Sequence, residues 1–154
     1  MNVDEAVKYV LRKYKTNDPS KIAEKLKVIL ITTNLVDIRG FYQYWKRNHI
    51  IYLDEKLPSI ELNFVLAHEI GHMLMHKKSN AMFLDSRTFF SLSSYEREAN
   101  LFAVELLLPD SLLKEYRNTS LYTLAQSVGI PNELAQLKFK NLQSKINNGC
   151  RFSL

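Results

Sequence analysis

The five residues His68-Glu69-Ile70-Gly71-His72 constrain this chain more than any other part of its sequence. If the segment is helical, His68 and His72 lie one turn apart on the same face, where two ring nitrogens can converge on one ion. Glu69 lies about 100° further round the helix, so it would not be a ligand but could act on a water held by the metal. This arrangement is typical of zinc peptidases. The alternative is a helix with two incidental histidines.

The residues around the motif favour a helix. Residues 60–76 are apolar nearly all round, which is typical of a helix buried inside a domain. Two imidazoles and a carboxylate would be costly to bury there without partners, and a metal would supply them. His76 continues the stripe, but about 12 Å of helical rise separates it from His68, so both cannot bind one ion. We expect His76 at the surface or behind the ligands at the helix end, and His49, which has no motif around it, as an ordinary packed or exposed residue.

A third ligand must come from downstream, where residues 93–109 are expected to form an amphipathic helix. On a helical wheel Glu96 tilts toward the apolar arc, whereas Glu98, which lies beside Glu105, is more solvent-facing. Glu96 is therefore the favoured third ligand, and Glu98 is the alternative. Asn100, one turn after Glu96, could hydrogen-bond a ligand histidine and orient it.

Two features before this helix have more than one interpretation. Ser93 and Glu96 have the spacing of a capping box, in which the Glu96 side chain would only satisfy a backbone N–H and would bind no metal. Residues 77–93 form a long polar segment with several interspersed aromatic side chains. These aromatics either close over a substrate or pack down as a small satellite core.

Three segments together carry a family resemblance: the histidine motif, residues 96–103, and the run Leu106-Leu107-Leu108-Pro109. They resemble the ImmA/IrrE family of bacterial metallopeptidases, and residues 37–42 with 50–53 are similar to the strands before the metal helix in its mobile-element or prophage branch. Leu108 stands where the family often has Met, which affects packing and not chemistry. The resemblance implies a regulatory protease that cleaves the helix-turn-helix repressor of a prophage or conjugative element.

Length and composition suit one domain of 154 residues, with a metallopeptidase core at about residues 1–110 and a helical C-terminal extension at about residues 111–154. The N-terminus lacks the apolar region of a signal peptide, and the apolar residues 60–76 are too short and too interrupted to span a bilayer. Cys150 is alone, so no intrachain disulfide can form. These features indicate the cytoplasm and argue against a membrane as partner.

The predicted fold class is α+β. Apolar spacing predicts a helix over residues 3–14, followed by a short helix that Asp18 caps. Residues 28–32 are expected to form a buried strand, and residues 38–45 and 49–53 two further strands around a short turn. A small antiparallel sheet of these strands would pack on a zincin-type metal-binding helix and could present an edge strand to an extended peptide substrate.

A helical segment is expected to complete the chain. Asp110 and Ser120 are candidate helix caps, and two helices flank the turn at Gly129-Ile130. Such a pair is either a DNA-binding helix-turn-helix or an ordinary helical hairpin that packs on the domain. The modest net charge of +5 favours the hairpin, so nucleic acid is not the favoured partner.

We therefore predict a zinc-dependent, gluzincin-like endopeptidase in which His68, His72 and Glu96 bind Zn2+ and Glu69 is the general base. Its partner would be a protein substrate, the helix-turn-helix repressor that the resemblance implies. No tyrosine is singled out by spacing as an oxyanion stabiliser. The alternatives are a non-catalytic DNA- or partner-binding regulator with a structural zinc site, and a stress-response or toxin-antitoxin member of the same family.

Overall fold

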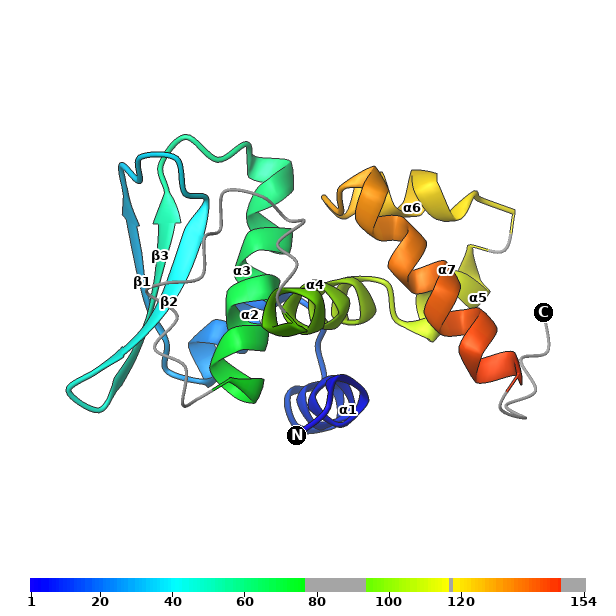
Figure 1. Ribbon diagram of the computed structural model, residues 1–154, viewed down its shortest axis with the longest axis horizontal. Helices are drawn as coiled ribbons and strands as arrows, with labels where there is room; N and C mark the ends of the chain where they lie inside the picture. Colours follow the sequence, from blue (N-terminus) through cyan, green and yellow to red (C-terminus); the bar gives the residue numbers. More distant parts are fainter. Residues whose placement is uncertain (77–93, 117, 148–154) are drawn as a thin grey trace.

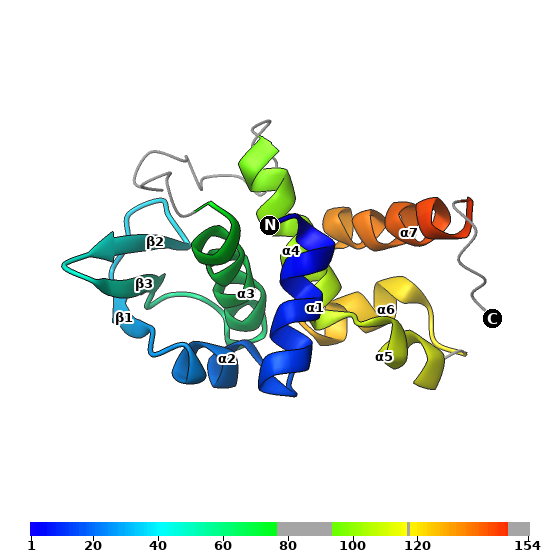
Figure 2. The ribbon, with the colours of Figure 1, turned by 90° about the horizontal axis from the view of Figure 1, so that it is seen from below.

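The computed structural model describes residues 1–76, 94–116 and 118–147 of the chain. Its elements are, in chain order, α1 (Val3–Tyr14), α2 (Pro19–Lys25), β1 (Ile29–Thr33), β2 (Gly40–Trp45), β3 (Asn48–Asp54), α3 (Ser59–Met75), α4 (Ser94–Leu107), α5 (Asp110–Glu115), α6 (Leu121–Ser127) and α7 (Asn132–Asn147). Figure 1 shows the sheet and the C-terminal helices on opposite sides of α3 and α4. From below, in Figure 2, α1 runs alongside α4, which it contacts. The arrangement confirms the α+β class.

The sheet is small and mixed, with the strand order β1-β3-β2. β2 and β3 form an antiparallel hairpin, whereas β1 pairs parallel with β3. The prediction of an antiparallel sheet is therefore corrected for one of its two strand pairs. The cause is the connection after β1, which carries the chain past the central position to the far edge of the sheet, where it forms β2. The chain then turns back as β3, which lies between β1 and β2 and runs in the same direction as β1. The central place buries Ile50, Ile51 and Leu53 of β3.

Strand β1 lies at the opposite edge from β2, and the prediction that it is buried is wrong. The side chains of Ile29 and Leu30 are 44% and 41% exposed. An apolar run rich in β-branched residues favours the extended conformation, but it does not distinguish a central strand from an edge strand. Only the pairing with β3, which starts at Ile29 opposite Ile50, decides which it is.

Helix α3 is apolar nearly all round because other elements cover it on both sides. The sheet packs on one side and α4 on the other, and α2 also contacts it. Two glycines allow the close approaches. A Cβ on Gly40 would lie 2.9 Å from Val65 Cγ1 of α3, and a Cβ on Gly71 would lie 3.0 Å from the Phe102 ring of α4. These contacts fix the distances from α3 to β2 and to α4.

Local sequence signals account for the starts of several helices. The Asp18 side chain accepts hydrogen bonds from the N–H groups at the start of α2, and Ser120 does the same for α6, as predicted. Asp110 does not cap α5: the N-cap is Pro109, and Asp110 is the first helical residue. Its carboxylate is engaged by Lys138 of α7.

The C-terminal helices pack on the rest of the chain. Leu134, Ala135 and Lys138 of α7 are buried, and α7 contacts α4. The turn between α6 and α7 is pressed against the start of α3, since a Cβ on Gly129 would lie 1.8 Å from the carbonyl oxygen of Ile60. The helical pair thus packs on the domain, as the hairpin prediction requires. Within the described ranges no helix is both long and apolar enough to cross a membrane.

Candidate metal centre

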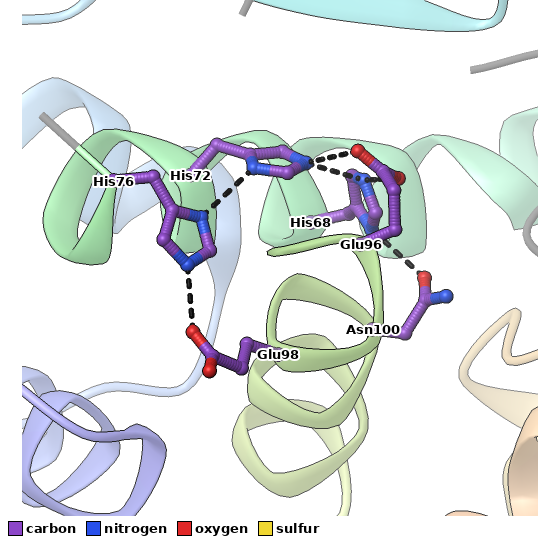
Figure 3. Close-up of polar contacts among 6 residues, drawn as sticks. All are labelled: His68, His72, His76, Glu96, Glu98 and Asn100. Atoms are coloured by element: carbon purple, nitrogen blue, oxygen red, sulfur yellow. Dashed lines mark hydrogen bonds and ion pairs between the residues drawn. The ribbon is translucent and has the colours of Figure 1, made fainter. Parts of the chain in front are cut away.

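The candidate metal centre lies between α3 and the first turn of α4. His68 and His72 are one turn apart on α3, and Glu96 of α4 reaches both of them. The Glu96 carboxylate oxygens lie 3.2 Å from His68 Nε2 and 3.1 Å from His72 Nε2, and the two Nε2 atoms are 3.0 Å apart. All three side chains are buried, and Figure 3 shows them converging. The structure thus brings together the three residues predicted as ligands.

The donor set and its spacing fit a zinc ion. Two imidazole nitrogens and one carboxylate are the protein ligands of several catalytic zinc sites, which keep a fourth position open. Ligand atoms bound tetrahedrally at about 2.0–2.1 Å from one ion lie about 3.3 Å from one another. The distances between the three side chains approach that value. The pairwise fit requires only small movements of these side chains.

Asn100 lies where the wheel places it, one turn beyond Glu96. His68 Nδ1 is 2.9 Å from Asn100 Oδ1, so the ring donates its Nδ1–H to the amide oxygen and presents Nε2 to the cluster. Both side chains are buried.

His76 is buried at the end of α3 and is not a surface residue. Its Nδ1 lies 3.1 Å from His72 Nδ1, on the side of that ring away from Glu96. Of the two predicted positions, the structure therefore shows the one behind His72 and not the one at the surface. Burial is also the main reason why the pKa of His76 lies below its ordinary value.

Glu98 and Glu96 point to different partners although they lie on the same helix. The Glu98 side chain is half exposed and accepts a hydrogen bond from His76 Nε2, outside the cluster. Ser93, the other member of the predicted capping box, and the predicted loop at residues 77–93 lie outside the described residues. The Glu96 carboxylate itself is engaged with the two histidines.

Glu69 is buried on α3 beside the cluster and does not belong to it. Burial raises the pKa of its carboxyl to about 7, although His72 and a hydrogen bond from the Tyr42 backbone act in the opposite direction. For Glu96, burial would also raise the pKa, but hydrogen bonds from His68 and His72 outweigh it and hold the pKa at about 2. At neutral pH the two carboxylates therefore differ in their readiness to accept a proton.

Sequence reasoning missed Tyr42 and the partnership of His76 with Glu98. Tyr42 lies on the edge strand β2, and no motif marks a backbone N–H that reaches a helix distant in sequence. His76 lies four residues after His72, and residues at this spacing are neighbours on a helix surface. This spacing could have indicated the contact between the two histidine rings. His49, in contrast, is packed as expected, with its Nδ1 2.8 Å from the Tyr42 hydroxyl.

The fold and the cluster define a candidate metalloprotein in which two histidines of one helix meet a carboxylate of the next. The chain belongs to the Peptidase_M78 family, the IrrE N-terminal-like domain, which matches residues 12–140 and is a family of metallopeptidases. It is 45% identical over 136 residues to the uncharacterized immunity region protein 2 of Bacillus phage phi105, covering 86% of each chain. It is 27% identical over 147 residues to the metallopeptidase ImmA of Bacillus subtilis (strain 168), covering 92% of this chain and 86% of that protein. These relationships confirm the resemblance identified from the motifs.

Proposed function

We propose that this protein is a zinc-dependent endopeptidase of regulatory type that cleaves the helix-turn-helix repressor of a prophage or conjugative element. The observation that carries the proposal is the buried convergence of two imidazole nitrogens and a carboxylate next to a second buried carboxylate. His68, His72 and Glu96 would hold the metal, and Glu69 would be the general base.

The two carboxylates are suited to different roles. When bound, zinc supplies a Lewis acid that polarises the scissile carbonyl and lowers the pKa of water toward about 7. Glu69, whose pKa burial raises to about 7, can take a proton from the attacking water and give it to the departing amine. Glu96, with a pKa of about 2, stays ionised as a ligand at the same pH. Their different surroundings thus separate proton transfer from metal binding.

The edge of β2 that faces away from β3 offers a place for an extended substrate. A hairpin with a two-residue turn closes on a hydrogen-bonded pair, here Trp45 and Asn48, so the backbone groups of Tyr44 and Tyr42 point away from β3. The hydrogen bond from the Tyr42 backbone to Glu69 agrees with this direction. The Tyr42 carbonyl therefore lies on the same edge. A peptide that paired with this edge would pass directly by the general base.

The relatives support the regulatory setting. One is named for a phage immunity region and the other is named a metallopeptidase. A peptidase in an immunity region has a natural target in the DNA-binding repressor of the same element, which is the substrate class that the family resemblance implies. The packing of the α6–α7 turn against α3 supports this function over DNA binding by the same helices.

The test is to co-express the chain with the helix-turn-helix repressor of the same element and to follow repressor fragments by intact mass. Glu69→Gln should leave the zinc content unchanged and lower cleavage by about a hundredfold to ten-thousandfold, because an amide cannot accept the proton. Equal fragment yields from the two proteins would remove Glu69 from the mechanism. If wild type binds zinc but yields no fragments, the non-catalytic regulator becomes the better account, and a gel shift with steep salt dependence would support it.

A further inference from the structure

The ring of His72 makes an unusual contact on the side away from the candidate metal position. Histidine ligands commonly donate their second ring N–H to a carboxylate, a backbone carbonyl or a water. Here His72 Nδ1 meets His76 Nδ1 at 3.1 Å, and His76 Nε2 in turn meets Glu98 Oε2 at 2.8 Å. Figure 3 shows this chain of contacts, which runs from Glu96 through His72 and His76 to Glu98.

The hydrogen bonds determine one another along the chain. If His72 binds a metal through Nε2, its ring proton is on Nδ1 and must be donated to His76 Nδ1. His76 Nδ1 is then an acceptor, so the His76 proton is on Nε2. That N–H points at the Glu98 carboxylate, which accepts it. Every donor therefore meets an acceptor in only one arrangement of protons.

Helix geometry explains how two neighbouring carboxylates serve different histidines. His72 and His76 lie one turn apart, so their rings meet on one face of α3. Glu98 follows Glu96 by two residues, which places it about 200° further round α4 and away from the cluster. The Tyr95 ring, whose centroid is 4.6 Å from that of His76, packs against the imidazole. The His76 side chain is 4% exposed and the Glu98 side chain 49%, so the chain of contacts ends at the surface.

We propose that His76 and Glu98 are positioning residues that set the ring-proton position and the orientation of His72, and so strengthen metal binding. The proposal rests on the proposed metal site. On the other side of the cluster, His68 Nδ1 donates to the side-chain amide oxygen of Asn100. The two proposed ligand histidines therefore differ in the acceptor of their Nδ1–H, which is an amide oxygen for His68 and a second imidazole for His72.

The first measurement is zinc affinity, obtained by competition with a chromophoric chelator. Glu98→Ala and His76→Phe should each weaken zinc binding by about tenfold to a hundredfold, the usual effect of removing a partner of a ligand histidine. Glu98→Gln should weaken it less than Glu98→Ala, because a Gln oxygen still accepts from His76 Nε2. Glu96→Ala, which removes a proposed ligand itself, should have the largest effect. Glu24→Ala, at an exposed position of α2, is the control for loss of one negative charge.

The second measurement reports the ring protons directly. Long-range 1H–15N correlation spectra of the zinc-bound wild type should show His76 protonated at Nε2 and unprotonated at Nδ1. In zinc-bound Glu98→Ala only the His72 Nδ1–H still selects this form, so a minor Nδ1-protonated population should appear in a protein with unchanged circular dichroism. Glu98 is half exposed, so Glu98→Ala should fold even if a substitution at the buried His76 position does not.

The outcomes separate the two proposals. Wild-type zinc binding together with control-like affinities in Glu98→Ala and His76→Phe would overturn the positioning role alone. A His76 ring protonated at Nδ1 in the zinc-bound wild type would do the same, because it could not accept from His72. A wild type that binds no zinc would overturn the metal site and the positioning role together. Repressor cleavage is not used in either measurement.

Discussion

Glu69 is almost completely buried on α3, although its proposed role requires an ionised carboxylate at the moment of reaction. Burial raises its pKa from 4.5 to about 7, so the folded protein holds the protonated form over a pH range in which the unfolded chain is ionised. The unfolded state therefore loses its proton first as the pH rises. Stability contributed by this residue is fully present below pH 4.5 and is lost between pH 4.5 and about 7.

We expect Glu69→Gln to remove this loss in the metal-free protein. At pH 4.5 the variant and wild type should have similar free energies of unfolding, and by pH 8 the variant should be more stable by on the order of 3 kcal/mol. The measurement is urea unfolding of both proteins in the presence of a chelator over this pH range. Glu96, whose pKa is depressed, loses its contribution as the pH falls, but it does so in both proteins. Parallel curves from pH 4.5 to 8 would contradict the raised pKa.

The residues of the site differ in how far sequence alone could place them. His68, His72, Glu96 and Asn100 follow from helical spacing within two segments, and the structure brings all four together. His76 is buried because α4 crosses α3 near the C-terminal end of α3. The spacing of residues within α3 does not indicate where that crossing lies. Helical spacing thus predicted which side chains each helix presents on one face, whereas it did not predict where along α3 the helix α4 crosses.

At the scale of the elements, the candidate site depends on the distance between α3 and α4. Gly71 lies inside the histidine motif, where a Cβ would meet the Phe102 ring of α4 at 3.0 Å. A larger residue there would have to push the ring, and with it the helix that carries Glu96. The glycine would therefore contribute to the geometry of the proposed metal site although it supplies no ligand.

Gly71→Val should separate the two helices. The added side chain begins 3.0 Å from Phe102 Cδ1 and adds two further methyl groups, so we expect a loss of about 1–3 kcal/mol in stability and weaker zinc binding. Phe102→Leu provides space at the same contact, so the double variant should recover part of both losses. Unfolding free energies and zinc affinities of the four proteins form a double-mutant cycle. Strictly additive losses would show that Gly71 and Phe102 are not coupled.

For β1 and β2, the sequence predicted the type of element but not its position in the sheet. Residue type predicted that both are extended, and both are. Their places in the sheet were not predictable, because β1 is as apolar as a central strand and yet lies at an edge. The order of strands follows from the path of the connections and from what covers each face.

At the scale of the whole molecule, α7 gives α4 a second buried face. Helical spacing groups Glu105 with the solvent-facing Glu98, but Glu105 is buried under α7. Lys138, with no exposed surface, donates to Glu105 at 2.8 Å and to Asp110 at 2.6 Å, and Asn141 donates to the other Glu105 oxygen. A helical wheel treats each helix as having one buried side, so this network was not visible in the sequence.

Lys138→Met should destabilise the protein strongly, because it removes the buried ammonium group that lies 2.8 Å from the buried Glu105 carboxylate. Removing one partner of a buried pair costs about 3–5 kcal/mol, whereas replacing both partners can be nearly neutral. We therefore expect Glu105→Gln combined with Lys138→Met to recover most of the loss. Lys140→Met, the same change at an exposed position of α7, is the matched control and should have little effect.

The measurement is chemical unfolding of the four proteins without metal, followed by zinc titration of those that are folded. Glu105 lies nine residues after Glu96, about 13 Å along α4, so zinc affinity should not follow the stability changes. If Lys138→Met unfolds like the Lys140→Met control, the buried network contributes no stability. If it weakens zinc binding as well, the contact between α7 and α4 also sets the position of Glu96, and the C-terminal helices are part of the metal site's support.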